Sequence, residues 1–246
     1  MAKTQFTGFP QMVAADPLEN SDTQSMPLGA YMETADGRGF RYCKVGGTST
    51  VAGRIYQAAA EDTTNFQSLT CAVNAVGDTT VTTTTNVTLT AAQAANLAGG
   101  TLIVISATLG SGRIYKIKSV AAVSAAPAVF VLEDPIAVAT TGTVIVDVHP
   151  NPYSGVIITP AGTATSCVVG VATCVITNGQ FGWLQVRGAA PVLSSTAMTI
   201  GNNVKALHAT VAGAGTLATN GVDASIGFSL TGVATTDVGH VFLTIG

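Results

Sequence analysis

The sequence has little charge and few aromatic residues. Charged residues make up 9% of the 246 residues, against roughly 25% in an ordinary soluble domain. Aromatic residues are 6% of the chain although hydrophobic residues are 47%, so much of the apolar content is Ala and Val. A chain of this length buries a core, but few charges remain to keep its surface soluble. We therefore expect a surface that is covered by partners or built from Thr, Ser, Gly and Ala, as in proteins of large assemblies.

The sequence also lacks cationic runs, long apolar stretches and nucleotide motifs. Ten Lys and Arg oppose 13 Asp and Glu, for a net charge of −3, and nucleic-acid binding needs clustered cations. No stretch approaches the roughly 18 uninterrupted apolar residues of a membrane helix, and no apolar run follows Lys3 as it would in a signal peptide. The phosphate-loop pattern G-x-x-x-x-G-K-[ST] is missing. The sequence predicts no nucleic acid, no membrane contact and no cofactor.

Cysteine and histidine are too sparse to predict a metal site. The four cysteines are Cys43, Cys71, Cys167 and Cys174, and the three histidines are His149, His208 and His240. Only Cys167 and Cys174 lie close together, and their spacing is not that of a zinc knuckle. We expect buried free thiols in a protein made in the cytoplasm, with a Cys167–Cys174 disulfide as the alternative.

No arrangement of residues predicts catalysis. Ser166-Cys167 and Ser194-Ser195 lie in no G-x-S-x-G sequence and have no paired His. The adjacent acids Glu61-Asp62 and Glu133-Asp134 lie in turns, and neighbouring residues of a strand point to opposite faces. The sequence therefore predicts that the protein is not an enzyme.

Short apolar strands separated by Gly, Pro and Asn turns predict a mainly β protein, a short-stranded barrel or sandwich. We expect one main domain from residues 29–76 and 149–246. Residues 77–148 are expected to form an inserted small β unit with one short helix at residues 91–97, because Thr90 is a good N-cap and Gly99 a good helix end. The two prolines of the segment 149–153 predict a rigid connector.

The segment Cys174–Leu193 contains the chain's single Trp. Asn178-Gly179 predicts a tight hairpin turn in which both residues have positive φ. On the return strand, expected at 181–187, alternation places Phe181, Trp183 and Gln185 on one face, and Leu184 and Val186 on the other. Trp183 is therefore expected at the centre of a hairpin that is covered on both faces.

Residues 1–28 are predicted to form an extended N-terminal arm, since Pro10, Pro17 and Pro27 prevent a helix or a central strand. Its isolated apolar residues favour docking on a neighbouring subunit over a disordered tail; the candidate anchors are Phe6, Phe9, Met12, Leu18 and Met26. Arg187, at a strand exit beside small residues, is a further candidate interface residue. A solvated strand end is the alternative for Arg187.

The Trp segment GQFGWLQVRGAAPVL, residues 179–193, resembles a segment of structural proteins of tailed bacteriophages that are encoded beside the major capsid protein. Three more stretches fit the same resemblance: LGAYMETADGRGFRYCKVGG, AGRIYQAAAEDTTNFQSL and VHPNPYSGVI. One departure is that the proline usual after the strand-ending glycine is replaced by Ala189 or Ala190.

The resemblance implies a capsid decoration (cement) protein, a virion structural protein that binds the outer surface of the shell and stabilises it. Its partners are then the major capsid protein and further copies of itself, with a trimer as the expected homo-oligomer. It would be made in the host cytoplasm and located on the capsid exterior. The alternative is a tail-associated or adhesion module that binds host surface glycans through exposed aromatic residues such as Tyr115 or Tyr153.

Overall fold

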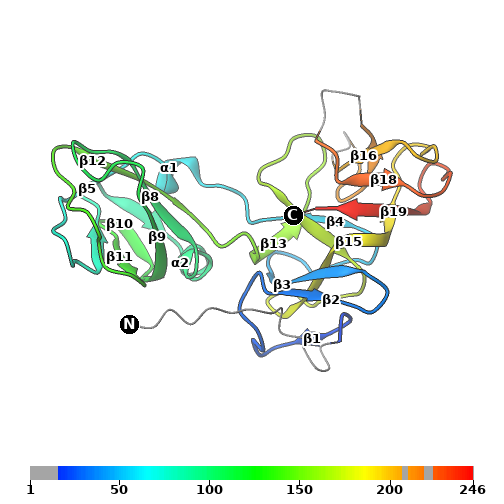
Figure 1. The fold of residues 1–246 in the computed structure, drawn as a ribbon, viewed down its shortest axis with the longest axis horizontal. Helices are drawn as coiled ribbons and strands as arrows, with labels where there is room; N and C mark the ends of the chain where they lie inside the picture. The colour runs from blue at the N-terminus through cyan, green and yellow to red at the C-terminus, as the bar shows by residue number, and fades with distance from the viewer. Residues whose placement is uncertain (1–15, 207–209, 219–223, 246) are drawn as a thin grey trace.

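The computed structural model describes residues 16–206, 210–218 and 224–245. It confirms a mainly β fold with two short helices. Figure 1 shows two lobes, joined by two chain segments: the inserted lobe in cyan and green, and the main lobe formed by the described residues before and after it. Each lobe is built around strands that close, or nearly close, into a barrel.

Five strands of the main lobe form a closed ring. In spatial order they are β3 (Gly39–Val45), β13 (Ser154–Ile158), β4 (Ile55–Gln57), β14 (Val168–Ala172) and β15 (Phe181–Leu193), which pairs again with β3. The pairing of β13 with β3 is parallel and the other pairings are antiparallel. Cys43, Tyr56, Val156 and Leu184 are buried together in one core cluster. Ring closure leaves these strands without free edges.

Strand β15 is long enough to belong to a second sheet. Its second half pairs with β19 (Val238–Thr244), and the order continues through β18 (Gly227–Ser229), β16 (Asn203–Lys205) and β17 (Thr216–Leu217). A parallel bridge between Ser194 and Gly215 brings the end of this sheet back towards β15. Val192, Val241 and Leu243 are buried in its core. β15 is therefore a wall shared by two barrel-like halves.

Trp183 lies in an aromatic cluster, defined by the buried residues Met32, Phe40, Tyr42, Phe181 and Trp183. Trp183 is fully buried, and its ring meets that of Tyr42 edge-on at a centroid distance of 5.0 Å. Leu184 packs in a different cluster. The expected division of faces along β15, with both sides covered, is therefore confirmed for these residues.

The turn before this strand differs from the prediction. A turn does lie at Asn178-Gly179, but of the two residues only Gly179 has positive φ, at 82°. β14 pairs with β15 only at a distance from this turn, where Ala172 lies opposite Leu184. The loop between β14 and β15 instead bonds to the segment between β3 and β4: the Thr50 amide donates to the Ile176 carbonyl over 2.8 Å. Backbone partners outside the hairpin thus replace the tight pairing.

Residues 16–28, which we call the clasp, pack against the main-lobe barrel of the same chain. Within the clasp, β1 (Asn20–Ser21) pairs with the beginning of β15, and Asn20 faces Gly182. The Trp183 indole donates a 3.2 Å hydrogen bond to Glu19 Oε2. Next along the chain, β2 (Tyr31–Glu33) pairs with β3. This described part of the expected arm covers the chain's own aromatic cluster, whereas Phe6, Phe9 and Met12 lie outside the described residues.

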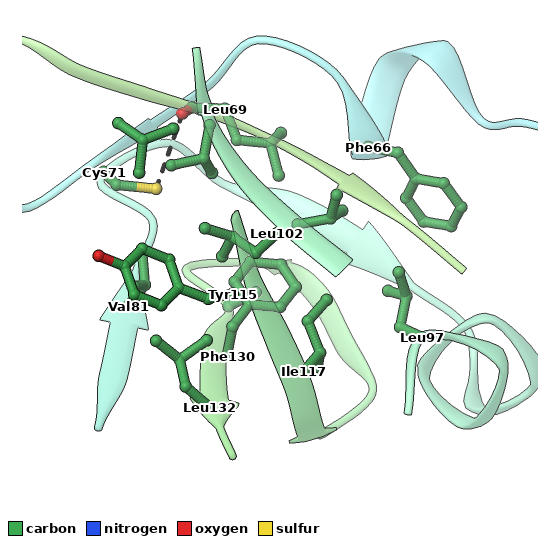
Figure 2. Packing of buried hydrophobic residues seen from close by; sticks show 14 of the residues in the cluster. Phe66, Leu69, Cys71, Val81, Leu97, Leu102, Tyr115, Ile117, Phe130 and Leu132 are labelled. Atoms are coloured by element: carbon green, nitrogen blue, oxygen red, sulfur yellow. Dashed lines mark hydrogen bonds between the residues drawn. The ribbon is translucent and has the colours of Figure 1, made fainter. Parts of the chain in front are cut away.

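The inserted lobe contains the remaining elements. These are α1 (Thr63–Phe66), β5 (Leu69–Cys71), β6 (Thr80–Thr82), β7 (Val87–Leu89), α2 (Ala91–Leu97), β8 (Thr101–Ser106), β9 (Ile114–Val120), β10 (Val123–Ala126), β11 (Val129–Leu132) and β12 (Val144–His149). Six strands are ordered β5-β12-β8-β9-β11-β6, and an antiparallel bridge between Cys71 and Thr83 closes the ring. Figure 2 shows Leu102, Tyr115, Ile117 and Phe130 gathered in its interior.

The inserted lobe begins earlier than the sequence analysis placed it. The expected start was residue 77, but β5 pairs with β12, and Phe66 and Leu69 are buried in the lobe's core. At the start of the lobe, residues 63–66 form the single helical turn α1, and its N-cap is Asp62.

The predicted helix at residues 91–97 is present as α2. Thr90 caps it through a reciprocal pair of hydrogen bonds: the Gln93 amide donates to Thr90 Oγ1 over 3.2 Å, and the Thr90 amide donates to Gln93 Oε1 over 2.9 Å. This capping box satisfies two backbone N–H groups at the start of the helix, those of Thr90 and Gln93. Gly99, with φ of 76°, follows the helix end.

Helix α2 also joins the two lobes. Ser154 Oγ at the start of β13 donates to Asn96 Oδ1 over 3.0 Å, and the Asn151 amide donates to the Asn96 carbonyl over 3.1 Å. Gly155 has φ of 70° and lies directly beside the Asn96 side chain, which leaves no room for a Cβ at this position. The junction is therefore a small polar contact rather than a shared apolar core.

Candidate interaction surface

The outer side of the second sheet carries an exposed aromatic row. By strand register, Ala189 of β15 lies opposite Phe242 of β19, which lies opposite Phe228 of β18, which lies opposite Asn203 of β16. The Phe228 and Phe242 rings stack at a centroid distance of 5.2 Å and an interplanar angle of 14°. Phe228 retains 38% of its surface in solvent. Alternation explains the row, because the intervening Val241 is buried.

A second row continues this surface. The Leu230 amide donates to the His240 carbonyl, and His240 lies opposite Pro191 of β15. Leu230 is 36% exposed and Val238, at the start of β19, is 57% exposed. The Phe242 face, as we call it, comprises Arg187, Ala189, Pro191, Asn203, Phe228, Leu230, Val238, His240 and Phe242. Contiguous exposed apolar surface of this kind marks interaction sites more often than isolated apolar residues do.

This part of the chain is almost uncharged. Residues 149–246 contain four charged residues, which are Arg187, Lys205, Asp223 and Asp237. Arg187 is exposed at one edge of the Phe242 face, opposite Thr244 of β19 and Gly39 of β3. Within the described ranges the ion pairs are Arg38–Asp36 and Lys116–Glu133, so Arg187 has no carboxylate at pairing distance there.

The nearest acid in register with Arg187 is Glu33. It lies opposite Gly39, which is itself opposite Arg187, so two strand spacings, about 10 Å, separate the two backbones. Glu33 accepts a 3.1 Å hydrogen bond from the Tyr31 hydroxyl. The Arg187 guanidinium is therefore available to a carboxylate from outside the chain.

The candidate residues from the sequence are not all brought together. Arg187 lies on the Phe242 face, where the sequence analysis had left a subunit contact and a solvated strand end as alternatives. Leu18 and Met26 belong to the clasp: Leu18 is 57% exposed, and Met26 is half-buried against the aromatic cluster. Phe228 and Phe242 were not proposed as site residues. Each lies between two buried residues of its strand, so alternation along residues 227–229 and 241–243 is the signal that could have placed it outward.

Neither tyrosine named for glycan binding is an open platform. Tyr115 is 6% exposed and packs inside the inserted lobe (Figure 2). Tyr153 is half-buried, and the Arg41 guanidinium carbon lies 5.9 Å from its ring centroid. The same guanidinium lies 5.3 Å from the Tyr31 ring. The expectation that Tyr115 is exposed is therefore wrong.

The cysteines are free thiols in differing environments. Cys43 and Cys71 are buried, Cys174 is half-buried and Cys167 is exposed, so the alternative Cys167–Cys174 disulfide is not formed. Burial raises the pKa of Cys71 to about 12 and also raises the pKa of Cys43. A thiol with a raised pKa is a poor nucleophile and metal ligand. Within the described ranges, no three His, Cys, Asp or Glu side chains group as metal ligands do.

A cavity of about 780 Å³ lies beside the second sheet, and its walls include Cys167, Lys205, Ile226 and Ile245. Among the described residues that line it there is neither a histidine nor a carboxylate to pair with the Cys167 thiol. Among the helices described, none has the length and apolar character needed to cross a bilayer.

Comparisons with protein-family models, with curated proteins and with solved structures find no match to this chain.

Proposed function

We propose that the protein is a virion structural protein that binds the outer surface of a bacteriophage capsid and stabilises the shell. The observation that carries the proposal is the Phe242 face, an exposed aromatic surface on a rigid sheet in a nearly uncharged half of the molecule. Such a surface gains free energy when a partner covers it. A protein that is permanently bound to a lattice has that partner.

The place of the phage-like segments in the fold supports this proposal. The segment with Trp183 forms β15, the strand shared by the two halves of the main lobe. The other three segments contribute β3, β4 and most of β13 to the closed ring. The resemblance therefore concerns the scaffold that holds the Phe242 face, and it gives no contact residues by itself.

The size of the Phe242 face supports an oligomer on the lattice. The face occupies four strands about 4.8 Å apart and four rows about 7 Å apart, so its outermost positions enclose roughly 300 Å². A stable interface buries about 800 Å² on each partner. One face alone would bind weakly, whereas several linked copies would bind tightly through their combined contacts. We propose a homo-oligomer, with a trimer as the expected state.

The inserted lobe is expected to project from the bound main lobe, because it is attached through two chain segments and the small contact at Asn96 (Figure 1). Its core does not depend on the main lobe, since every residue of its buried cluster lies between Phe66 and Val148.

The test uses purified protein and undecorated capsids of the phage that encodes it. Cosedimentation across a range of protein concentrations should give saturable binding, and saturated capsids should resist heat disruption better than bare ones. A version lacking residues 1–15 keeps the clasp and tests the expected anchors Phe6, Phe9 and Met12. Absence of binding by the complete chain would refute the proposed function.

A further inference from the structure

We infer that the partner of the Phe242 face is an apolar surface that carries a carboxylate at one edge, and that Arg187 binds this carboxylate. This inference rests on the proposed function and names the chemistry of the surface that the protein binds. The observation that carries it is the Arg187 guanidinium, which has no carboxylate partner among the described residues and lies at the margin of the stacked Phe228–Phe242 pair.

The centre of the Phe242 face selects an apolar partner. Phe228, Phe242 and Leu230 project from two adjacent strands, with Ala189 and Pro191 beside them on β15. These side chains offer carbon atoms and aromatic faces, and they leave no place for a buried charge on the partner. Burying a charge among them without a counter-charge would be strongly unfavourable.

The edge of the Phe242 face selects a carboxylate. Arg187 projects where β15 passes from the first ring to the second sheet, beside Thr244. Arg38 packs against Gly188, the residue after Arg187, and the Arg38 guanidinium is already paired with Asp36 at 2.7 Å. A guanidinium binds a carboxylate through two parallel N–H···O bonds, and an apolar surround strengthens them by excluding water.

A second copy of the chain fits these requirements less well. The outward positions of the Phe242 face contain Arg187 and His240 but neither Asp nor Glu. The exposed acid beside the face, Asp237, precedes Val238 at the end of the β15–β19 pairing that is far from Arg187. Two copies would therefore meet the requirement only in one orientation, with Arg187 of each over the far end of the other. We assign the acid to a different protein, and the proposed oligomer forms through another surface.

Three variants test this chemistry. Arg187→Glu reverses the charge at the edge, and Phe228→Ser removes half of the aromatic stack. Lys118→Glu is the matched control, because Lys118 is an exposed cation on β9 of the inserted lobe. Circular dichroism and thermal melts should be unchanged in Arg187→Glu and Lys118→Glu, since both side chains are exposed.

The first readout needs no capsid. A peptide array presents apolar 12-residue peptides with one Glu beside identical peptides with Gln in its place. The wild-type protein and Lys118→Glu should bind the Glu members about tenfold more strongly. Arg187→Glu should lose this preference, and Phe228→Ser should lose binding to both members. Equal binding of Glu and Gln members by the wild-type protein would overturn the inference.

The second readout separates this inference from the proposed function. In capsid cosedimentation, Arg187→Glu should bind at least about tenfold more weakly than Lys118→Glu. Capsid binding that is equal in both variants would leave the function standing and refute the role of Arg187. A preference for Glu peptides without any capsid binding would do the reverse. Sedimentation velocity completes the test: loss of self-association in Phe228→Ser or Arg187→Glu would identify a second copy as the occupant and overturn the inference.

Discussion

Phe130→Ala should unfold the inserted lobe at a lower temperature and leave the main lobe unchanged. Phe130 is fully buried inside the six-stranded ring, where it lies opposite Val81 and Val120 (Figure 2). Removing a buried Phe ring loses about 1.5–3 kcal/mol of transfer free energy. The cavity left behind raises the total cost to about 3–5 kcal/mol.

The assay is differential scanning calorimetry, in which the two lobes should give separate transitions. For a lobe of this size, each kcal/mol shifts the melting temperature by about 4–8 °C, so the inserted lobe should melt at least about 12 °C lower. The matched control is Val129→Ala, because Val129 is the neighbouring residue of β11 and is 45% exposed; its effect should stay within about 0.5 kcal/mol. A single transition that moves as a whole would refute independent cores.

Three further predictions concern the clasp, the first helix and the thiols. Gly182→Ala should release the clasp, because a Cβ there would lie 2.6 Å from the Glu19 carbonyl oxygen; limited proteolysis should then cut residues 16–28 faster, and unchanged cleavage would contradict the clasp. Burial raises the pKa of Asp62, but hydrogen bonds from Asn65, Gln93 and Thr64 outweigh it and the net pKa lies below 3.8. Ionised Asp62 therefore contributes its full stabilisation above the pKa that it has in the unfolded chain, and this contribution disappears as the pH falls through the pKa that it has in the folded protein. Between about pH 5 and pH 2, the melting temperature of the inserted lobe should fall more steeply in the wild-type protein than in Asp62→Asn. A thiol reagent at pH 8 should label exposed Cys167 first and buried Cys71 only on unfolding; early labelling of Cys71 would contradict its burial.

Local signals in the sequence predicted much of the fold. Alternation assigned Trp183 and Leu184 to opposite faces of β15. The cap at Thr90 and the glycine at Gly99 fixed α2 within its observed bounds. These features depend on residues close together in the chain, which is why the sequence was sufficient for them.

Long-range pairing explains the differences. The strand expected at residues 181–187 continues to Leu193 because β19 pairs along the second half of β15. The boundary at residue 77 was late because β5 obtains its partner, β12, from the far end of the inserted lobe. Residues 16–28 were predicted to be part of an extended arm because local patterns do not reveal the partner of their two-residue strand, which lies about 160 positions away.

The candidate surface was predicted in part. Arg187 was identified because a cation at a strand exit beside small residues can lie flat against a neighbouring subunit. Phe228 and Phe242 come from separate strands, and only the register of β18 with β19 shows that their rings meet. The positions of Leu18 and Met26 follow from the clasp, which local patterns do not reveal.

The most direct test of the central claim is cosedimentation of a Phe228→Ser, Phe242→Ser double variant with undecorated capsids. The control is Ile114→Ser, which removes a more exposed apolar side chain, 64% in solvent, from the inserted lobe. Loss of an aromatic pair at the centre of an interface should weaken binding at least about tenfold, whereas the control should bind as the wild-type protein does. A double variant that folds and binds capsids with unchanged affinity would contradict the claim that the Phe242 face holds the protein on the shell.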